Sequence, residues 1–228
     1  MNEGDSIARL EEARRAVEAR IAEACGRSAR DPEEVTVVAV TKGFPPETAA
    51  EAVRAGFMEL GENYVQELVT KRGAAPEATW HLVGRLQRNK VGPALEHADV
   101  IHTLEPGSAV GRVSRMVRDL ERTPRLLVEV DFAVGRVGVP PNEAEGFVRR
   151  LHDDLGLAVR GLMTVAPLGE DPRPTFAALR RLRDALRERY EDVVELSMGM
   201  SIDLEAAVEE GATMVRVGTA IFGPRPTR

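Results

Sequence analysis

The sequence has few of the residues that would place it in an oxidising compartment or in a membrane. Cys25 is the only cysteine in 228 residues, so no disulfide forms within the chain, a pattern typical of proteins from reducing compartments. No apolar stretch approaches the roughly 20 residues that a membrane-spanning helix requires. The charged first residues do not resemble a secretion signal. We therefore expect a cytoplasmic protein that does not enter a membrane.

Positive charge is also limited. The chain has 31 lysines and arginines against 37 aspartates and glutamates, a formal net charge of −6. Proteins that bind nucleic acids normally concentrate basic residues on one surface, so we expect no nucleic-acid partner. The four histidines lack the spacing of metal ligands, and no metal site is predicted. Lysine is scarce as well, since Lys42, Lys71 and Lys90 are the only three.

What the chain does contain is an alternation of apolar segments and helical patterns. After an amphipathic N-terminal helix, the predicted strands cover residues 35–41, 57–60, 80–83, 100–104, 126–130, 159–164, 194–198 and 214–217. Helix-sized connections between strands imply a parallel sheet. Eight such units favour an α/β fold, a single (β/α)8 TIM barrel with an extra N-terminal helix, over an open doubly wound sheet. No linker divides the chain, so residues 1–228 are predicted to form one domain.

Lys42 stands at the end of the first predicted strand, in the stretch VTVVAVTKG. In a TIM barrel, functional residues lie on the loops that follow the carboxyl ends of the strands. A lysine there either extends its ammonium group to solvent or is a desolvated amine with a lowered pKa, suited to forming a Schiff base with a carbonyl compound. Lys71 competes less well, because it ends a polar helix where its charge would interact favourably with the helix dipole.

The loops after the last two strands are rich in small and hydroxyl residues. Gly199 and Ser201 follow the seventh strand, and Gly218 and Thr219 follow the eighth. Loops at these positions, together with a helix N-terminus, are the usual phosphate site of a TIM barrel. Small residues let backbone N–H groups approach an anion closely. Glycines also form ordinary turns, but two such loops at the right strands favour phosphate binding.

Arg216 lies within the apolar eighth strand. A buried guanidinium without a partner is very costly, so its side chain must meet a ligand or an acid such as Glu129 or Glu195. In a closed barrel the eighth strand neighbours the first, which brings Arg216 near Lys42. An amine, a phosphate site and a guanidinium facing one cavity describe pyridoxal 5'-phosphate held at both ends. An arginine against the pyridine nitrogen would keep that nitrogen unprotonated and weaken the ring as an electron sink.

Two further residues are weaker candidates. Asn63, in the stretch GENYVQE, follows the second strand and is available either to a ligand or as a helix cap. His81 lies within the third strand, in WHLVGRLQRNK. A single histidine in a strand is more often a satisfied core residue than a catalyst.

At these motifs the sequence resembles a known family, the pyridoxal phosphate homeostasis proteins, also called proline-synthase co-transcribed homologues. The resemblance covers nearly the whole chain and rests on AVTK, GENYVQE, WHLVGRLQRNK and LSMGMSIDLEAAVEEGATMVRVGTAIFG. It implies a barrel similar to the cofactor domain of alanine racemase, in which Lys42 carries the cofactor and Arg216 faces the ring nitrogen. It also implies that the phosphate is held by Ser201, Gly218 and Thr219, and that Asn63 and Met200 line the site.

The resemblance further implies a carrier or buffer of pyridoxal phosphate in vitamin B6 homeostasis, without robust catalysis. A monomer is expected, with pyridoxal phosphate-dependent apoenzymes as candidate recipients of the cofactor. Two residues depart from the family pattern. Arg136 replaces a lysine that the family often shows after the fifth strand, and Ile202 replaces an acid that often precedes Asp203. Both departures put loop and partner details in doubt rather than cofactor binding.

Two enzyme alternatives stay open. An amino-acid racemase needs a second acid–base group opposite the lysine, and the chain has only two tyrosines, Tyr64 and Tyr190. Arg216 also disfavours the carbanion that racemisation requires. A Schiff-base barrel enzyme acting on a sugar phosphate would need an acid–base pair, and none stands out by its spacing.

Overall fold

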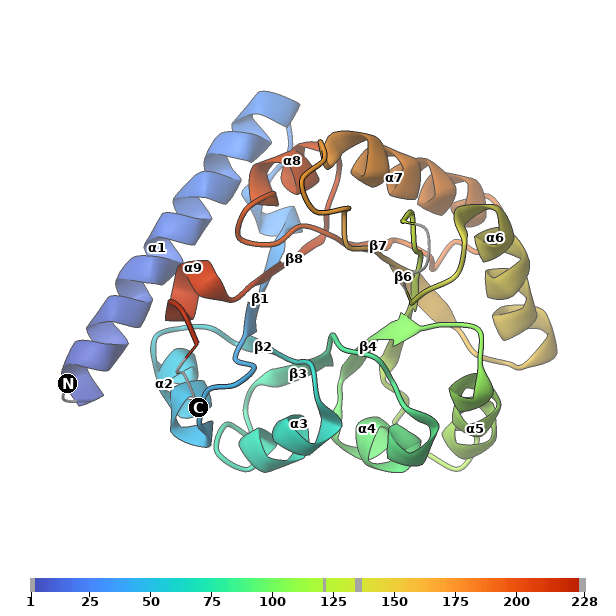
Figure 1. Cartoon of the computed structure of the whole chain (residues 1–228), viewed down its shortest axis with the longest axis horizontal. Helices are drawn as coiled ribbons and strands as arrows, with labels where there is room; N and C mark the ends of the chain where they lie inside the picture. Colours follow the sequence, from blue (N-terminus) through green and yellow to red (C-terminus); the bar gives the residue numbers. More distant parts are fainter. Residues whose placement is uncertain (1–2, 121, 134–136, 226–228) are drawn as a thin grey trace.

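The computed structural model describes residues 3–120, 122–133 and 137–225. Eight parallel strands close into a ring in chain order, with the last strand paired to the first (Figure 1). The predicted TIM barrel is therefore confirmed. The strands are β1 (Thr36–Val40), β2 (Glu59–Glu62), β3 (Thr79–Leu82), β4 (Val100–Leu104), β5 (Arg125–Glu129), β6 (Val159–Met163), β7 (Glu195–Ser197) and β8 (Met214–Val217).

Helices surround the ring of strands. They are α1 (Glu3–Ser28), α2 (Pro46–Arg54), α3 (Val65–Arg72), α4 (Val91–His97), α5 (Ser108–Val117), α6 (Pro141–Arg149), α7 (Arg173–Arg187), α8 (Leu204–Glu209) and α9 (Thr219–Phe222). Short 3-10 turns precede β1 and α4, and a π-helical turn follows α6. Each strand except the last is followed by a helix before the next strand begins, which is the crossover that a parallel sheet requires.

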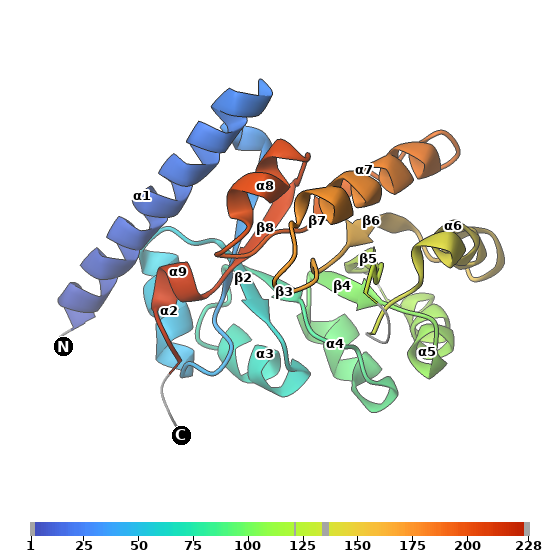
Figure 2. The same cartoon turned by 45° about the horizontal axis from the view of Figure 1, so that its top comes forward.

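The predicted extra helix, α1, lies outside the barrel against α2, α8 and α9 (Figure 2). Its buried face includes Leu10, Val17 and Ile21. From the same helix, Arg20 donates hydrogen bonds to the carbonyl oxygen of Ser201 at 3.0 Å and to both carboxylate oxygens of Glu205 at 2.6 and 2.9 Å. The helix therefore holds the loop that follows β7, one of the two predicted phosphate loops.

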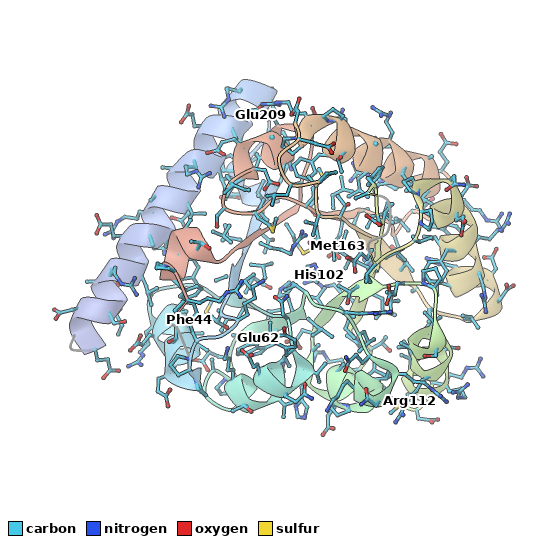
Figure 3. All side chains as sticks on the ribbon, in the orientation of Figure 1. Phe44, Glu62, His102, Arg112, Met163 and Glu209 are labelled. Atoms are coloured by element: carbon cyan, nitrogen blue, oxygen red, sulfur yellow. The ribbon has the colours of Figure 1, made fainter. Side chains whose placement is uncertain are left out.

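The apolar core has two parts. Its larger part lies between the ring and the helices, and takes alternate strand residues such as Ala39, Leu60 and Val215. A small cluster consists of Val38, Val100, Leu127 and Met214, which occupy the opposite parity of their strands and so face the barrel interior. The interior also holds buried polar side chains, and Figure 3 shows His102 within the ring of strands, close to Met163. Buried polar groups need partners, and these partners build the candidate site.

Two general features of the described residues bear on the sequence predictions. Among the helices that the structure describes, none has the length and hydropathy of a transmembrane segment. Within the same residues, no three or more histidine, cysteine, aspartate or glutamate side chains gather as metal ligands would.

Candidate cofactor site

A cavity of about 450 Å³ lies at the carboxyl ends of the strands. The structure brings all of the site residues predicted from the sequence into its wall: Lys42, Asn63, Met200, Ser201, Arg216, Gly218 and Thr219. Pockets for small ligands typically measure about 300–1,000 Å³, so the cavity has the size of a cofactor site. Loops after β1, β2, β7 and β8 meet there, although they are far apart in the sequence.

Lys42 lies half-buried in the turn directly after β1. Burial lowers the pKa of its amine below the ordinary lysine value of 10.5, and the guanidinium groups of Arg225 and Arg216 lower it further, against an opposing effect of Glu62. At a given pH, a larger fraction of this amine is neutral than in an exposed lysine. The neutral amine is the form that attacks a carbonyl carbon.

The turn that carries Lys42 is held by a buried lysine. Nζ of Lys71, which is 2% exposed, donates to the carbonyl oxygen of Thr41 at 2.8 Å, to Glu62 Oε1 at 2.6 Å and to Glu67 Oε2 at 3.0 Å. Glu67 Oε2 also accepts the N–H of Gly43 at 2.9 Å. We call these residues, Thr41, Glu62, Glu67 and Lys71, the Lys71 cluster. Lys71 lies in the last turn of α3, at the helix end predicted from the sequence, and the strand-end carboxylate of Glu62 also draws its ammonium inward, which was not predicted.

Arg216 is 6% exposed and borders the cavity from β8. Its Nη1 donates to Ser197 Oγ at 2.6 Å and its Nη2 to the carbonyl oxygen of Thr164 at 2.9 Å. Burial lowers the pKa of the guanidinium to about 10, while the negative charges of Glu129 and Asp203 oppose that shift. Arg216 therefore stays protonated at neutral pH and presents a fixed positive charge to the cavity.

Neither of the two acids considered from the sequence bonds directly to Arg216 among the described residues. Glu195 forms an ion pair with Arg125 instead, because it begins β7 whereas Arg216 lies near the end of β8. The prediction of Glu195 as a partner is wrong. Glu129 interacts with Arg216 through its charge alone, and burial together with nearby Glu105 raises the pKa of Glu129 to about 7.

A chain of hydrogen bonds continues from Arg216 through the barrel interior. Ser197 Oγ lies 2.8 Å from His102 Nδ1, and His102 Nε2 lies 2.8 Å from His81 Nδ1. His81 Nε2 lies 2.6 Å from Glu59 Oε2, at the opposite end of the barrel. We call these five residues the histidine chain. The expectation that His81 is a satisfied core residue agrees with these contacts, but its meeting with His102 was not predicted.

With neutral rings, the carboxylate end of the histidine chain assigns its protons. A carboxylate only accepts, so His81 donates from Nε2 to Glu59 and accepts at Nδ1 from His102 Nε2. His102 Nδ1 then accepts from the hydroxyl of Ser197, whose oxygen also accepts from Arg216. Burial holds the pKa of His102 well below its usual value of 6.5, which is consistent with the neutral ring.

The loop after β7 requires a glycine at its first turn. Gly199 has φ +89°, and a Cβ atom there would lie 2.3 Å from the Cβ of Ala207, so another residue would be strained and would clash. The turn directs the chain back over the barrel mouth. The N–H of Met200 then bonds to Asp203 Oδ1 at 2.5 Å, which fixes the loop beside the cavity.

The two predicted phosphate loops are joined to one another. The N–H of Ala220 donates to Ser201 Oγ at 3.3 Å, so the loop after β7 touches the first turn of α9. Gly218 precedes that turn and Thr219 begins it. The hydroxyl groups of Ser201 and Thr219 thus lie together with Gly218 at one side of the cavity. Other parts of the cavity wall are apolar.

Asn63 lies in the cavity wall and does not cap α3, whose N-cap residue is Tyr64. Its position depends on a close contact with the next loop. A Cβ atom added to Gly84 would lie 2.1 Å from the carbonyl oxygen of Asn63. Only a glycine after β3 allows the two loops to approach in this way.

Comparisons with known proteins agree with this arrangement. The family model for the alanine racemase N-terminal domain matches residues 13–226. A pyridoxal phosphate homeostasis protein of Escherichia coli is 38% identical over 218 residues, covering 90% of this chain and 92% of the relative. Its counterpart in Pseudomonas aeruginosa is 36% identical over 214 residues, covering 92% and 93%.

The chain belongs to the family of pyridoxal phosphate homeostasis proteins. The resemblance seen in the sequence is thereby confirmed. Among solved structures, PipY of Synechococcus elongatus with pyridoxal phosphate bound is 37% identical, with a TM-score of 0.79, over 91% of this chain and all of that one.

In this family member the cavity has further wall residues that the sequence did not single out for the site: Val40, Phe44, Val83, Val165, Ile202, Gly223 and Arg225. The inward parity of β1 predicts Val40, which shares a strand face with Lys42. Arg225 follows the last helix, where no periodicity indicates its position. Of the two departures from the family pattern, Ile202 is 76% exposed at the cavity rim, and Arg136 lies outside the described residues.

Proposed function

We propose that this chain binds pyridoxal 5'-phosphate in the cavity as a Schiff base with Lys42, and acts as a carrier or buffer of the cofactor without robust catalysis. The proposal rests on one observation above all. An amine with a lowered pKa, a buried guanidinium and two loops with small and hydroxyl residues line the same cavity. PipY, with its bound pyridoxal phosphate, supports the same ligand for this chain.

The residues present fit the chemistry of this cofactor. Pyridoxal phosphate supplies an aldehyde that condenses with amines. The neutral amine of Lys42 would add to the aldehyde carbon, and the loss of one water would leave a C=N bond with no net gain or loss of protons. Ser201, Gly218 and Thr219 would hold the phosphate, and Arg216 would donate to the pyridine nitrogen. Asn63 and Met200 would complete the wall around the ring.

The absence of a second acid–base group in the described cavity wall is the reason to propose a carrier. The ionisable wall residues of the described chain are Lys42, Arg216 and Arg225, and a guanidinium does not serve as a general acid or base near neutral pH. Tyr64, a candidate for a second acid–base group in the racemase alternative, is 63% exposed and lies outside that wall. Recipient apoenzymes, a monomeric state, one domain over residues 1–228 and a cytoplasmic location belong to the same proposal.

The test is an absorption spectrum of the purified protein with added pyridoxal phosphate, before and after borohydride reduction. We expect a Schiff-base band that reduction removes, and peptide mass spectrometry that finds the modification on Lys42. Lys42→Ala should lose the band but keep weaker binding through the phosphate loops. Lys90→Ala is the matched control, because Lys90 lies outside the cavity wall.

A colourless protein that also fails to bind added cofactor would contradict the proposal. A band that survives in Lys42→Ala would place the cofactor on another lysine. Lys71→Ala is unsuitable as a control for this purpose, because Lys71 is buried within the fold. Robust, Lys42-dependent racemisation of amino acids, measured by chiral product analysis, would favour the enzyme alternative.

A further inference from the structure

The backbone on both sides of Lys42 is tied to a single buried ammonium group. The carbonyl oxygen of Thr41 accepts directly from Lys71 Nζ. The N–H of Gly43 reaches the same ammonium through Glu67, whose Oε2 accepts both groups. Lys42 is the residue between these two attachment points, so the direction in which its side chain leaves the turn depends on the cluster.

All of the hydrogen-bond donors of the Lys71 ammonium group are in use. An ammonium group has three donors, and Lys71 uses all three, on Thr41, Glu62 and Glu67. The hydroxyl of Thr41 also donates to Glu62 Oε1 at 2.5 Å. Side chains on a helix point back toward its N-terminus, which explains how Lys71 contacts residues at the start of α3 and at the strand ends. Lys71, near the end of α3, therefore extends toward the barrel mouth, where Figure 3 shows Glu62 at the margin of the ring.

We propose that Lys71 is a positioning residue for the amine of Lys42: the Lys71 cluster fixes the turn at residues 41–43 so that this amine meets the aldehyde carbon of the cofactor. The inference rests on the proposed function. Formation of a C=N bond requires the amine within a narrow range of distance and direction, and a displacement of about 1 Å costs up to roughly 100-fold in such reactions. Binding of the phosphate and the ring depends on other loops and does not require this turn.

The neighbouring residue on α3 provides a matched control. Arg72 donates to the carboxylate of Asp99 at 2.8 Å and to the carbonyl oxygen of His97 at 2.8 Å. This ion pair is also largely buried, but its partners precede β4, at the end of the barrel away from the cavity. Lys71→Met removes the ion pairs of Lys71 with Glu62 and Glu67, and Arg72→Met removes the ion pair of the next residue on the same helix with Asp99. Only Lys71→Met releases the turn that carries Lys42.

A milder pair of variants covers the case in which Lys71→Met does not fold. Glu67→Ala removes the acceptor of the Gly43 N–H and leaves the buried contact of Lys71 with Glu62 in place. Its carboxylate side chain is 26% exposed, so its loss is tolerable. Gln66→Ala changes the preceding, exposed residue of the same helix and is its control.

The experiment compares two ligands on each variant. Pyridoxal 5'-phosphate has the aldehyde, whereas pyridoxine 5'-phosphate has an alcohol in its place and cannot form a C=N bond. We expect the dissociation constant of pyridoxal 5'-phosphate, divided by that of pyridoxine 5'-phosphate, to rise on the order of 10- to 100-fold in Lys71→Met and in Glu67→Ala. Binding of pyridoxine 5'-phosphate should change less than about twofold, and both controls should keep the wild-type ratio.

A second probe works without recognition of the cofactor. Pyridine-4-carboxaldehyde and cyanoborohydride trap reactive amines, and peptide mass spectrometry gives the labelling of Lys42 relative to Lys90. This relative labelling should fall in Lys71→Met and Glu67→Ala, and stay unchanged in the controls.

An unchanged ligand ratio in both Lys71→Met and Glu67→Ala would overturn the inference. So would an equal loss of affinity for both ligands, which would assign the cluster to general support of the fold. A wild-type protein that binds neither phosphate ligand would instead contradict the proposed function. In that case the relative labelling of Lys42 still decides whether Lys71 positions it.

Discussion

Two buried polar networks reach the candidate site from opposite faces of the same sheet. The Lys71 cluster lies between the strands and α3, and holds the turn that carries Lys42. The histidine chain lies inside the ring and holds Arg216. Each network thus fixes one of the two basic side chains that we assign to the cofactor, Lys42 near its aldehyde and Arg216 at its ring nitrogen.

The two networks stabilise their buried charges in different ways. In the Lys71 cluster a cation contacts two carboxylates directly, at 2.6 and 3.0 Å. In the histidine chain the cation and its carboxylate lie at the two ends, with one serine and two neutral histidines between them. Loss of either charge in the Lys71 cluster should therefore lower the stability of the fold. In the histidine chain, the arrangement should depend mainly on which ring nitrogen of each histidine carries the proton.

The largest effect should follow from breaking the Lys71 cluster. Lys71→Met leaves Glu62, which is fully buried, without its cation, and we expect a loss of about 3–5 kcal/mol in the free energy of unfolding. The double variant Lys71→Met/Glu62→Met removes both charges, and its stability should return most of the way to the wild-type value. Urea unfolding followed by circular dichroism measures all three proteins. A double variant that is no more stable than Lys71→Met would contradict a direct coupling.

Glu129 acts on Arg216 through its charge, without a hydrogen bond to it, and this difference should appear in the pH dependence of stability. The pKa of Glu129 is raised to about 7 in the folded protein, from an ordinary value of 4.5. A raised carboxyl pKa stabilises the folded state below the unfolded pKa, and that contribution is lost as the pH rises through 7. Glu129→Gln does not titrate, so its stability relative to wild type should increase by about 3 kcal/mol between pH 4 and pH 8.

Unfolding in urea at several pH values measures this difference. Glu105→Gln is a useful control, because Glu105 is a secondary cause of the same shift after burial; its effect should have the same sign and a smaller size. A difference between Glu129→Gln and wild type that does not vary with pH would show that Glu129 has an ordinary pKa.

Most of the barrel and the principal site residues follow from local sequence signals. Apolar segments mark the strands, helical patterns between them imply parallel pairing, and small residues after the last two strands mark their loops. The parity of the eighth strand indicates that Arg216 faces inward. These features depend on residues within one strand or loop, so they can be predicted from the sequence alone.

The two buried networks cannot be predicted from local sequence signals, because each depends on contacts between residues that are distant in the sequence. The sequence places Lys71 at a polar helix end, and only the structure shows the carboxylate of Glu62 beside it. His81 and His102 lie on adjacent strands, and the signal that could have found their pairing is their shared inward parity. The partner of Glu195 depends on its depth within the barrel, which parity alone does not give.

The smallest effect should come from the outer end of the histidine chain. Glu59 is 30% exposed, and Glu59→Gln keeps an oxygen that accepts from His81 Nε2, so we expect a loss of less than about 1 kcal/mol in the free energy of unfolding. Because the amide oxygen of the glutamine can still accept from His81, both histidines should keep their protons on Nε2. Nitrogen-15 NMR of the imidazole rings distinguishes a protonated Nε2 from a protonated Nδ1 in wild type and variant. A shift of the His102 proton to Nδ1 in Glu59→Gln would show that the charge of the carboxylate sets the direction, and that the two networks both depend on their acids.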